Sequence, residues 1–282
     1  HLESLSLYDC QIKSLDGIGM LDCCPNLVTL NVGRNPLTEL PDEMGRMSSS
    51  LKELLLDDCQ LSGPFPECLL QLEELTTLRM SNNKITSIPS EIWRLSKLQV
   101  LCMDRNQISS VPLELQDLTD LRTLLLRHNQ IKELPEGVPG ATMLILTLLH
   151  ISSNQLSKLP DSLVECTPIT HLYANSNQLE KIPLGMERMT NLQRLNLCHN
   201  RIDYLPTDFR DAFGQPIPTS PEGLCEGGKV RPAFEMRNVE IADIRFLSSS
   251  HVLICTAFPV MPSAHKESEG TSWGKSRREG KR

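Results

Sequence analysis

The apolar residues of this 282-residue chain follow one pattern that repeats along most of its length. In the stretch 121–135, which reads LRTLLLRHNQIKELP, leucines stand at 121, 124 and 126, and an asparagine follows at 129. The alternation predicts a short strand in which Leu124 and Leu126 face inward while Leu125 faces the other side. The pattern occurs nine times, aligned on an asparagine or cysteine at Cys10, Asn35, Cys59, Asn83, Asn106, Asn129, Asn154, Asn177 and Asn200.

Spacings of 23 to 25 residues between these positions predict a repeat architecture in which each repeat forms one rung of a stack. One rung cannot bury its leucines alone, but stacked rungs share one continuous core. The amide of Asn129 and its equivalents is expected to be buried and to bond the backbones of adjacent rungs. Cys10 and Cys59 are expected to fill the same buried slot. At a strand spacing of about 4.8 Å, nine rungs predict a parallel sheet roughly 40 Å long.

The pattern L-x-x-L-x-L-x-x-N/C-x-L resembles the leucine-rich repeat, and the resemblance covers residues 2–206. The Leu-Pro ending, as at Leu134 and Pro135, is similar to the 23-residue repeats of intracellular Ras-pathway scaffolds of the Sur-8 kind, plant Ras-group proteins, Scribble, Erbin and Roco kinases. The resemblance implies an α/β fold, namely a leucine-rich-repeat solenoid with a parallel concave sheet and short helical or 3-10 segments on the convex side.

The return segments between strands carry apolar residues every three positions, as at Ile92, Leu95 and Leu98, which favours short helical or 3-10 turns. Trp93 is expected to be a half-buried cover on the convex side. The segment LSGPFP at 61–66 is similar to the Gly-Pro turn of plant-type repeats and is expected to alter curvature locally. The segment 136–145, with two glycines around Pro139, is expected to break the return helix as a flexible convex bulge or a bend.

The repeat pattern stops after Pro206, which predicts two regions. Residues 1–213 are predicted to form the solenoid, with nine repeats and a terminal turn that covers the open end of the core. Residues 214–282 are predicted to be a low-complexity, largely disordered tail, although 238–247 and 251–258 are candidate strands. Because the sequence starts at His1 in the middle of a rung, we expect it to be a fragment.

Composition argues against several classes of protein. A net charge of −7 and a pI near 5.6 disfavour nucleic-acid binding, which depends on clustered Lys and Arg. The ten cysteines form no cap framework, and the sequence has no signal peptide, no N-x-S/T acceptor and no apolar run of 18 residues. We therefore predict a protein of a reducing compartment, in the cytoplasm, without a membrane span.

The candidate catalytic and ligand-binding motifs of the sequence are weak, so we predict no enzyme activity, no cofactor and no bound metal. The Cys23-Cys24 pair has no second pair at ligand spacing. The segment 223–229 has the spacing of a phosphate-binding loop, but Val230 replaces the metal-binding Ser or Thr and prolines replace the preceding strand. His128, His150 and His199 are expected at exposed rung positions without a nucleophile or carboxylate partner.

Side chains that point outward from the sheet have no role in the core, so their identities are free to select a partner. The first predicted outward column is Ser6, Asn31, Leu55, Arg79, Cys102, Leu125, His150, Tyr173 and Asn196. The second is Tyr8, Gly33, Asp57, Ser81, Asp104, Arg127, Ser152, Asn175 and Cys198. The third is Asp9, Arg34, Asp58, Asn82, Arg105, His128, Ser153, Ser176 and His199.

Within these columns, a basic patch of three arginines is predicted beside acidic residues, with apolar side chains interleaved, as in many interface hot spots. The predicted partner-binding residues are Leu55, Asp57, Arg79, Asp104, Arg105, Leu125, Arg127, His150, Tyr173 and Asn175. The alternative is a solvated sheet face in which Asp104 neutralises Arg105 and Arg127.

The function predicted from these features is a non-enzymatic protein-interaction module or scaffold in intracellular signalling that binds on its concave face. The resemblance implies a protein partner such as a small GTPase, a phosphatase or a polarity protein. One alternative is the recognition region of a larger enzyme, a Roco-type kinase or a ubiquitin ligase, whose catalytic domain lies outside this chain. Another is an extracellular receptor ectodomain, which requires a signal peptide and cap cysteines upstream.

Overall fold

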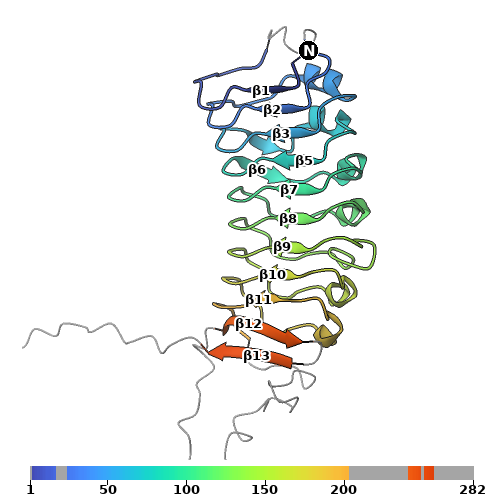
Figure 1. Ribbon diagram of the computed structural model, residues 1–282. Coiled ribbons are helices and arrows are strands. Elements are labelled where there is room, and N and C mark those ends of the chain that lie inside the picture. Colours follow the sequence, from blue (N-terminus) through green and yellow to red (C-terminus); the bar gives the residue numbers. More distant parts are fainter. Residues whose placement is uncertain (1, 17–23, 203–240, 249–250, 257–282) are drawn as a thin grey trace, which may run out of the picture.

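The computed structural model describes residues 2–16, 24–202, 241–248 and 251–256. Nine short strands stack as the rungs of a ladder, and short helices line one side of the stack (Figure 1). The strands are β1 (Ser4–Ser6), β2 (Thr29–Asn31), β3 (Glu53–Leu55), β5 (Thr77–Arg79), β7 (Val100–Cys102), β8 (Thr123–Leu125), β9 (Leu148–His150), β10 (His171–Tyr173) and β11 (Arg194–Asn196). Each pairs in parallel and in register with the next, which confirms the predicted solenoid and its parallel sheet.

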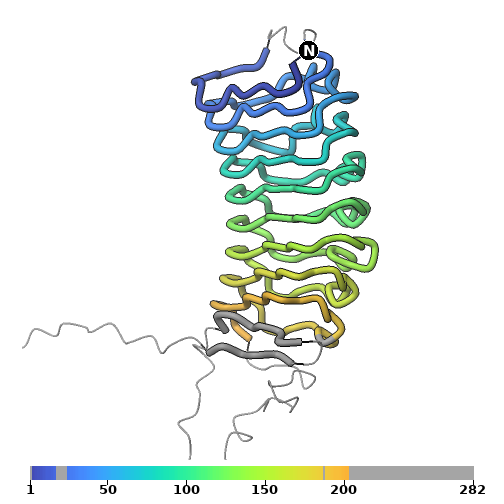
Figure 2. The backbone as a smooth tube through the Cα atoms, viewed as in Figure 1, coloured from blue at the N-terminus to red at the C-terminus, as the bar shows by residue number. Residues whose placement is uncertain are grey.

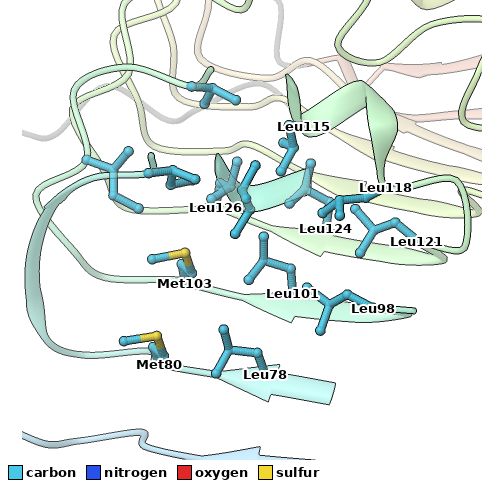
Figure 3. Close-up of a cluster of buried hydrophobic side chains, with 14 of the residues drawn as sticks. Leu78, Met80, Leu98, Leu101, Met103, Leu115, Leu118, Leu121, Leu124 and Leu126 are labelled. Carbon is cyan, nitrogen blue, oxygen red and sulfur yellow. The ribbon is translucent and has the colours of Figure 1, made fainter. Parts of the chain in front are cut away.

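The core forms because one leucine in the middle of each strand points inward. Leu124 is 1% exposed, whereas Leu125 beside it is half-buried on the outer face, as predicted. Figure 3 shows Leu78, Leu101 and Leu124 stacked on successive rungs. In-register pairing places equivalent leucines over one another, so neighbouring rungs share one core.

The asparagine of each rung joins it to its neighbour, as predicted. The Nδ2 of Asn129 donates to the carbonyls of Leu126 and Met103, both at 3.0 Å, and its Oδ1 accepts the N–H of Ile108 at 3.0 Å. In the third rung, the Cys59 thiol is buried and lies 3.6 Å from the carbonyl of Val32. Two of these partners lie 21 and 26 residues away, so the asparagine links rungs rather than a single turn.

Cys10 departs from this arrangement. The prediction of a buried Cys10 was wrong, because its side chain is exposed and its thiol lies 3.5 Å from the carbonyl of Tyr8 in the same rung. Cys10 lies in the end rung of the described stack, whereas the Cys59 thiol lies against the carbonyl of Val32 on the preceding rung.

The return segments form 3-10 helices, in agreement with the sequence prediction. Among the described residues these are η1 (Asp42–Met47), η2 (Glu67–Gln71), η3 (Ser90–Arg94), η4 (Leu113–Asp117), η5 (Asp161–Glu165) and η6 (Met186–Arg188). The first five begin directly after a proline, whose fixed φ suits a tight turn. Ile92, Leu95 and Leu98 are fully buried. Trp93 is 49% exposed, and the Arg94 guanidinium lies 5.9 Å from its ring centroid.

The plant-like turn in the third rung builds a second, small sheet. Strand β4 (Ser62–Pro64) pairs in parallel with β6 (Lys84–Ser87) of the next rung. Gly63 has a φ of 82°, a conformation that favours glycine, which explains why the turn needs this residue. The effect of this turn on curvature stays a prediction.

The segment 136–145 contains no helix, as predicted, and it bulges from the stack without interrupting it (Figure 2). Strands β8 and β9 on either side of it remain in register, so the segment is a bulge and not a bend. The Ser162 hydroxyl accepts the N–H of Gly137 at 2.7 Å and donates to the carbonyl of Pro139 at 2.9 Å. Thr142 donates to the carbonyl of Gln116 at 3.0 Å, so both neighbouring rungs hold the bulge.

Beyond β11, two antiparallel strands extend the sheet, β12 (Ile241–Ser248) and β13 (His251–Thr256). They coincide with the two candidate strands of the tail. The predicted terminal turn at 207–213 and the boundary at 213/214 lie outside the described residues, as do 214–240 and 257–282. The disorder of the tail therefore stays a prediction.

Candidate functional site

The concave face, defined here as the sheet surface opposite the leucine core, consists of four columns of side chains. The sequence analysis identified three of them and missed the column formed by the first residue of each strand. Its members are Ser4, Thr29, Glu53, Thr77, Val100, Thr123, Leu148, His171 and Arg194. The signal for it was present, because residues i and i+2 of a strand point to the same face and Thr123 must therefore lie beside Leu125.

All ten predicted partner-binding residues lie on this face. Leu125, His150 and Tyr173 are direct neighbours on β8, β9 and β10, and Leu55 is paired with Arg79 on β3 and β5. Cys102 is a correction to the first predicted outward column, because it is 4% exposed. Its thiol lies 3.0 Å from the hydroxyl of Ser81 on the preceding rung.

The two aspartates of the second column join rungs to one another. Asp57 accepts the backbone N–H of Ser81 at 2.7 Å, and its other oxygen lies 2.7 Å from Nε of Arg79. Asp104 accepts the N–H of Arg127 at 2.9 Å, and its other oxygen lies 3.0 Å from Nε of Arg127. The Nε–H of Arg127 does not point at that oxygen, so the second contact is an attraction between charges rather than a hydrogen bond.

These ion pairs correct the predicted basic patch. Asp57 compensates Arg79, and Asp104 compensates Arg127 rather than Arg105. Among the described residues, Arg105 has no ion-pair partner, although it adjoins Asp104 in sequence. Its backbone is left-handed, with a φ of 54°. One exposed arginine therefore remains available to an anionic partner.

The whole third column adopts this left-handed conformation, which the sequence analysis did not predict. The φ values lie between 53° and 58° at Asp9, Arg34, Asp58, Asn82, Arg105, His128, Ser153, Ser176 and His199. No glycine marks the position, but Asp, Asn and His occupy five of the nine sites, and these residues are favoured there. From Asp9 to Ser176, the N–H of each residue in this column bonds the next rung, as from His128 to the carbonyl of Ser152 at 3.0 Å.

Burial changes the protonation of two residues on this face. Burial raises the pKa of the Asp104 carboxyl, and the N–H and the positive charge of Arg127 act in the opposite direction. Burial also lowers the pKa of His150 to about 4, with further lowering by the charges of Arg127 and His128. His150 is therefore half-buried and neutral at pH 7, which corrects the exposed position expected from the sequence.

An aromatic cluster surrounds His150. Its ring centroid lies 5.0 Å from that of Tyr173, with 51° between the ring planes, and the His171 ring lies 6.3 Å from Tyr173. Asn175 shares a hydrogen bond with the hydroxyl of Ser152 on the preceding rung. The cluster offers a half-buried, uncharged surface on which an apolar side chain can pack.

Other classes of site were also considered within the part of the chain that the structure describes. There, no group of three or more His, Cys, Asp or Glu side chains stands close enough together to hold a metal ion. None of the described helices is long and apolar enough to cross a membrane.

Family comparisons agree with the ladder of rungs. A model described as "Leucine rich repeat" matches residues 49–108, 73–131 and 119–179. Two further leucine-rich repeat models match residues 1–42 and 191–212. The chain belongs to the leucine-rich repeat family. A comparison with curated proteins found no match.

Several solved leucine-rich repeat structures are similar to this chain. The ectodomain of the plant membrane receptor kinase GASSHO1/SCHENGEN3 from Arabidopsis thaliana, in complex with CASPARIAN STRIP INTEGRITY FACTOR 2, is 30% identical with a TM-score of 0.58, over 64% of this chain and 22% of that one. PEPR1 in complex with AtPEP1 is 28% identical with a TM-score of 0.63, over 71% and 29%. A leucine-rich repeat protein of Leptospira interrogans is 26% identical with a TM-score of 0.53, over 68% and 58%. This chain therefore spans less than two thirds of each of these proteins.

Proposed function

We propose that this leucine-rich repeat protein is a non-enzymatic interaction module that binds a protein partner on its concave face. The observation that carries the proposal is the combination of exposed Arg105 with half-buried Leu125 and Tyr173 on one side of a sheet whose other side supplies the core. These three side chains are not needed to fill the core. Apolar and aromatic side chains beside an arginine are enriched at protein interfaces.

The solved relatives support an interaction role. GASSHO1/SCHENGEN3 and PEPR1 are described in complexes with CASPARIAN STRIP INTEGRITY FACTOR 2 and AtPEP1, and the plant peptide hormone receptor RGFR1 in a complex with RGF2. We extend protein or peptide binding from these proteins to this chain as part of the proposal. The residues involved are the ten predicted ones together with the first strand column.

We further propose that the protein acts as a scaffold in intracellular signalling. The Leu-Pro ending of its rungs, which resembles the Sur-8 and Scribble type, supports this role, with a small GTPase, a phosphatase or a polarity protein as partner. The seven described cysteines are free thiols, which suits a reducing compartment such as the cytoplasm.

A receptor ectodomain is the second candidate. It is favoured by the plant-like turn at Gly63, which forms the β4–β6 sheet, and by the similarity to plant receptor ectodomains. The two candidates differ in redox environment, because an extracellular protein is expected to carry disulfides. Expression of the full-length gene with a fluorescent tag would separate them by location.

The binding face is tested by a pull-down with two matched double variants. The concave variant Arg105→Glu/Leu125→Asp introduces charge at exposed and half-buried positions of the sheet. The convex variant Arg94→Glu/Leu113→Asp makes the same changes on η3 and η4. We expect only the concave variant to lose the partner proteins, while both melt within a few degrees of the wild type. If only the convex variant lost the partner proteins, the interface would lie on the convex side and the proposed concave face would be wrong.

A further inference from the structure

The carboxylates of the concave face are concentrated toward one end. The first three rungs carry four of them, Asp9, Glu53, Asp57 and Asp58. From Thr123 to Ser176, none of the described residues in the four columns is Asp or Glu, and the ionisable basic groups are Arg127, His128, His150 and His171. The chain as a whole has a net charge of −7, whereas this part of the face has no carboxylate that would repel an acidic partner.

The carboxylate of Asp104, on the rung of β7, compensates Arg127 of this region and not Arg105. It is 8% exposed, and both of its oxygens already face Arg127. Arg105 lies beside it on the surface and has no ion pair with another described residue. An arginine in this setting presents its forked donors to an incoming carboxylate.

An uncharged floor lies next to Arg105. Leu125, His150 and Tyr173 follow one another on β8, β9 and β10, and each is half-buried. His150 is neutral above pH 5 because burial lowers its pKa to about 4, so the floor does not repel a carboxylate-bearing segment and does not attract it either. An apolar side chain on this floor gains hydrophobic contact on three successive strands.

We propose that Arg105, Leu125, His128, His150, His171 and Tyr173 together form a docking patch for an extended acidic segment of the partner protein. A carboxylate of the segment meets Arg105, and an aliphatic or aromatic side chain packs on Leu125, His150 and Tyr173. This inference rests on the proposed concave-face function and specifies the chemistry of its partner. Measured along the stack of rungs, Arg105 and Tyr173 lie three strand spacings apart, roughly 14 Å, which corresponds to about four or five residues of extended chain.

A random twelve-residue peptide library displayed on phage tests the inference when it is panned against the whole chain. We expect enriched peptides to carry Asp or Glu about four or five residues from an aliphatic or aromatic residue. A synthetic copy of the most enriched peptide should bind at least tenfold more weakly to Arg105→Glu and to Tyr173→Ala. The matched control is Arg34→Glu, because Arg34 has the same exposed left-handed position on the second rung. It should bind as the wild type does.

Enrichment of basic or uncharged peptides, no enrichment at all, or equal loss in Arg34→Glu would overturn the inference. Equal binding of poly-glutamate would also overturn it, because the apolar floor would then contribute nothing. If the acidic peptides fail while the concave pull-down variant still loses its partners, only the docking patch is wrong.

Discussion

Leu124 and Leu125 are adjacent in sequence but lie on opposite sides of the sheet, and the difference has a measurable energy. Leu124→Ala removes a fully buried side chain and should lower the free energy of unfolding by about 2–5 kcal/mol. Leu125→Ala removes a half-buried one and should cost less than about 1 kcal/mol. Urea denaturation of the two variants measures both values. Equal losses would show that the register of β8 is wrong.

His150 makes the stability of the fold depend on pH. Its pKa is about 4 in the folded protein, below the ordinary value of 6.5, so the folded state resists protonation. The contribution of His150 to the free energy of unfolding is therefore fully present above pH 6.5 and is lost as the pH falls toward 4. Asp104 acts in the opposite direction, because its raised pKa means that the folded state accepts a proton more readily than the unfolded chain.

We predict that His150→Gln flattens the fall in melting temperature between pH 6.5 and 4. Thermal melts of the wild type and the variant at matched pH values isolate the histidine, because Asp104 is present in both proteins. Parallel curves would mean that His150 titrates alike in the folded and unfolded states.

At the scale of the element, the asparagine column holds the rungs at the end of each strand. Asn129→Ala removes the acceptor of the Ile108 N–H and one of two amide donors to the carbonyl of Met103, which keeps its hydrogen bond from Asn106, and should cost about 1–3 kcal/mol. Asn129→Cys should cost less, because Cys59 occupies the same position in the third rung. Urea denaturation compares both with the exposed control Gln130→Ala. If Asn129→Ala lowered the free energy of unfolding no more than Gln130→Ala does, the asparagine column would not stabilise the stack.

The left-handed column is the element-scale feature that pattern reasoning missed. The core leucines can be recognised in the sequence by their spacing, and the asparagines by their residue type. The nine residues of the left-handed column share a φ near 55° but have no common side chain. The conformation is imposed by its neighbours, because the inward asparagine and the N–H bond to the next rung both require it. A backbone constraint of this kind leaves only a statistical trace in the sequence, here the excess of Asp, Asn and His.

At the scale of the whole molecule, the core runs along the stack of rungs, and five of the seven described cysteines are buried. Burial raises the pKa of the Cys68 thiol to about 11 and that of Cys166 to about 12, which makes both poor nucleophiles. Cys10 is exposed on the first rung. Thiol reactivity therefore reports both the stacking of the rungs and the redox state of the chain.

We predict ten free thiols when protein purified anaerobically from a reducing cytosol is denatured and labelled. Among the seven described cysteines, Cys10 should react first under native conditions, and Cys166 only when its rungs open, as followed by mass spectrometry of labelled peptides. Intramolecular disulfides recovered under these conditions would favour the receptor ectodomain over the intracellular scaffold.

The sequence alone determined the number of rungs, the inward leucines, the asparagine ladder and the 3-10 turns after proline. These features depend on short-range rules, since strand alternation has a period of two and each rung repeats after 23 to 25 residues. Column membership followed from the same rules, which is why all ten predicted partner-binding residues lie on one face.

Only the tertiary structure decided which of those residues are available. The pairing of Asp57 with Arg79, the burial of Cys102 and the neutral state of His150 all depend on side chains 21 to 23 residues apart in sequence that stacking brings into contact. Ion-pair choice and desolvation are set by distances of a few ångströms between rungs. Such distances follow from side-chain and backbone conformation, and a pattern of residue types does not contain them.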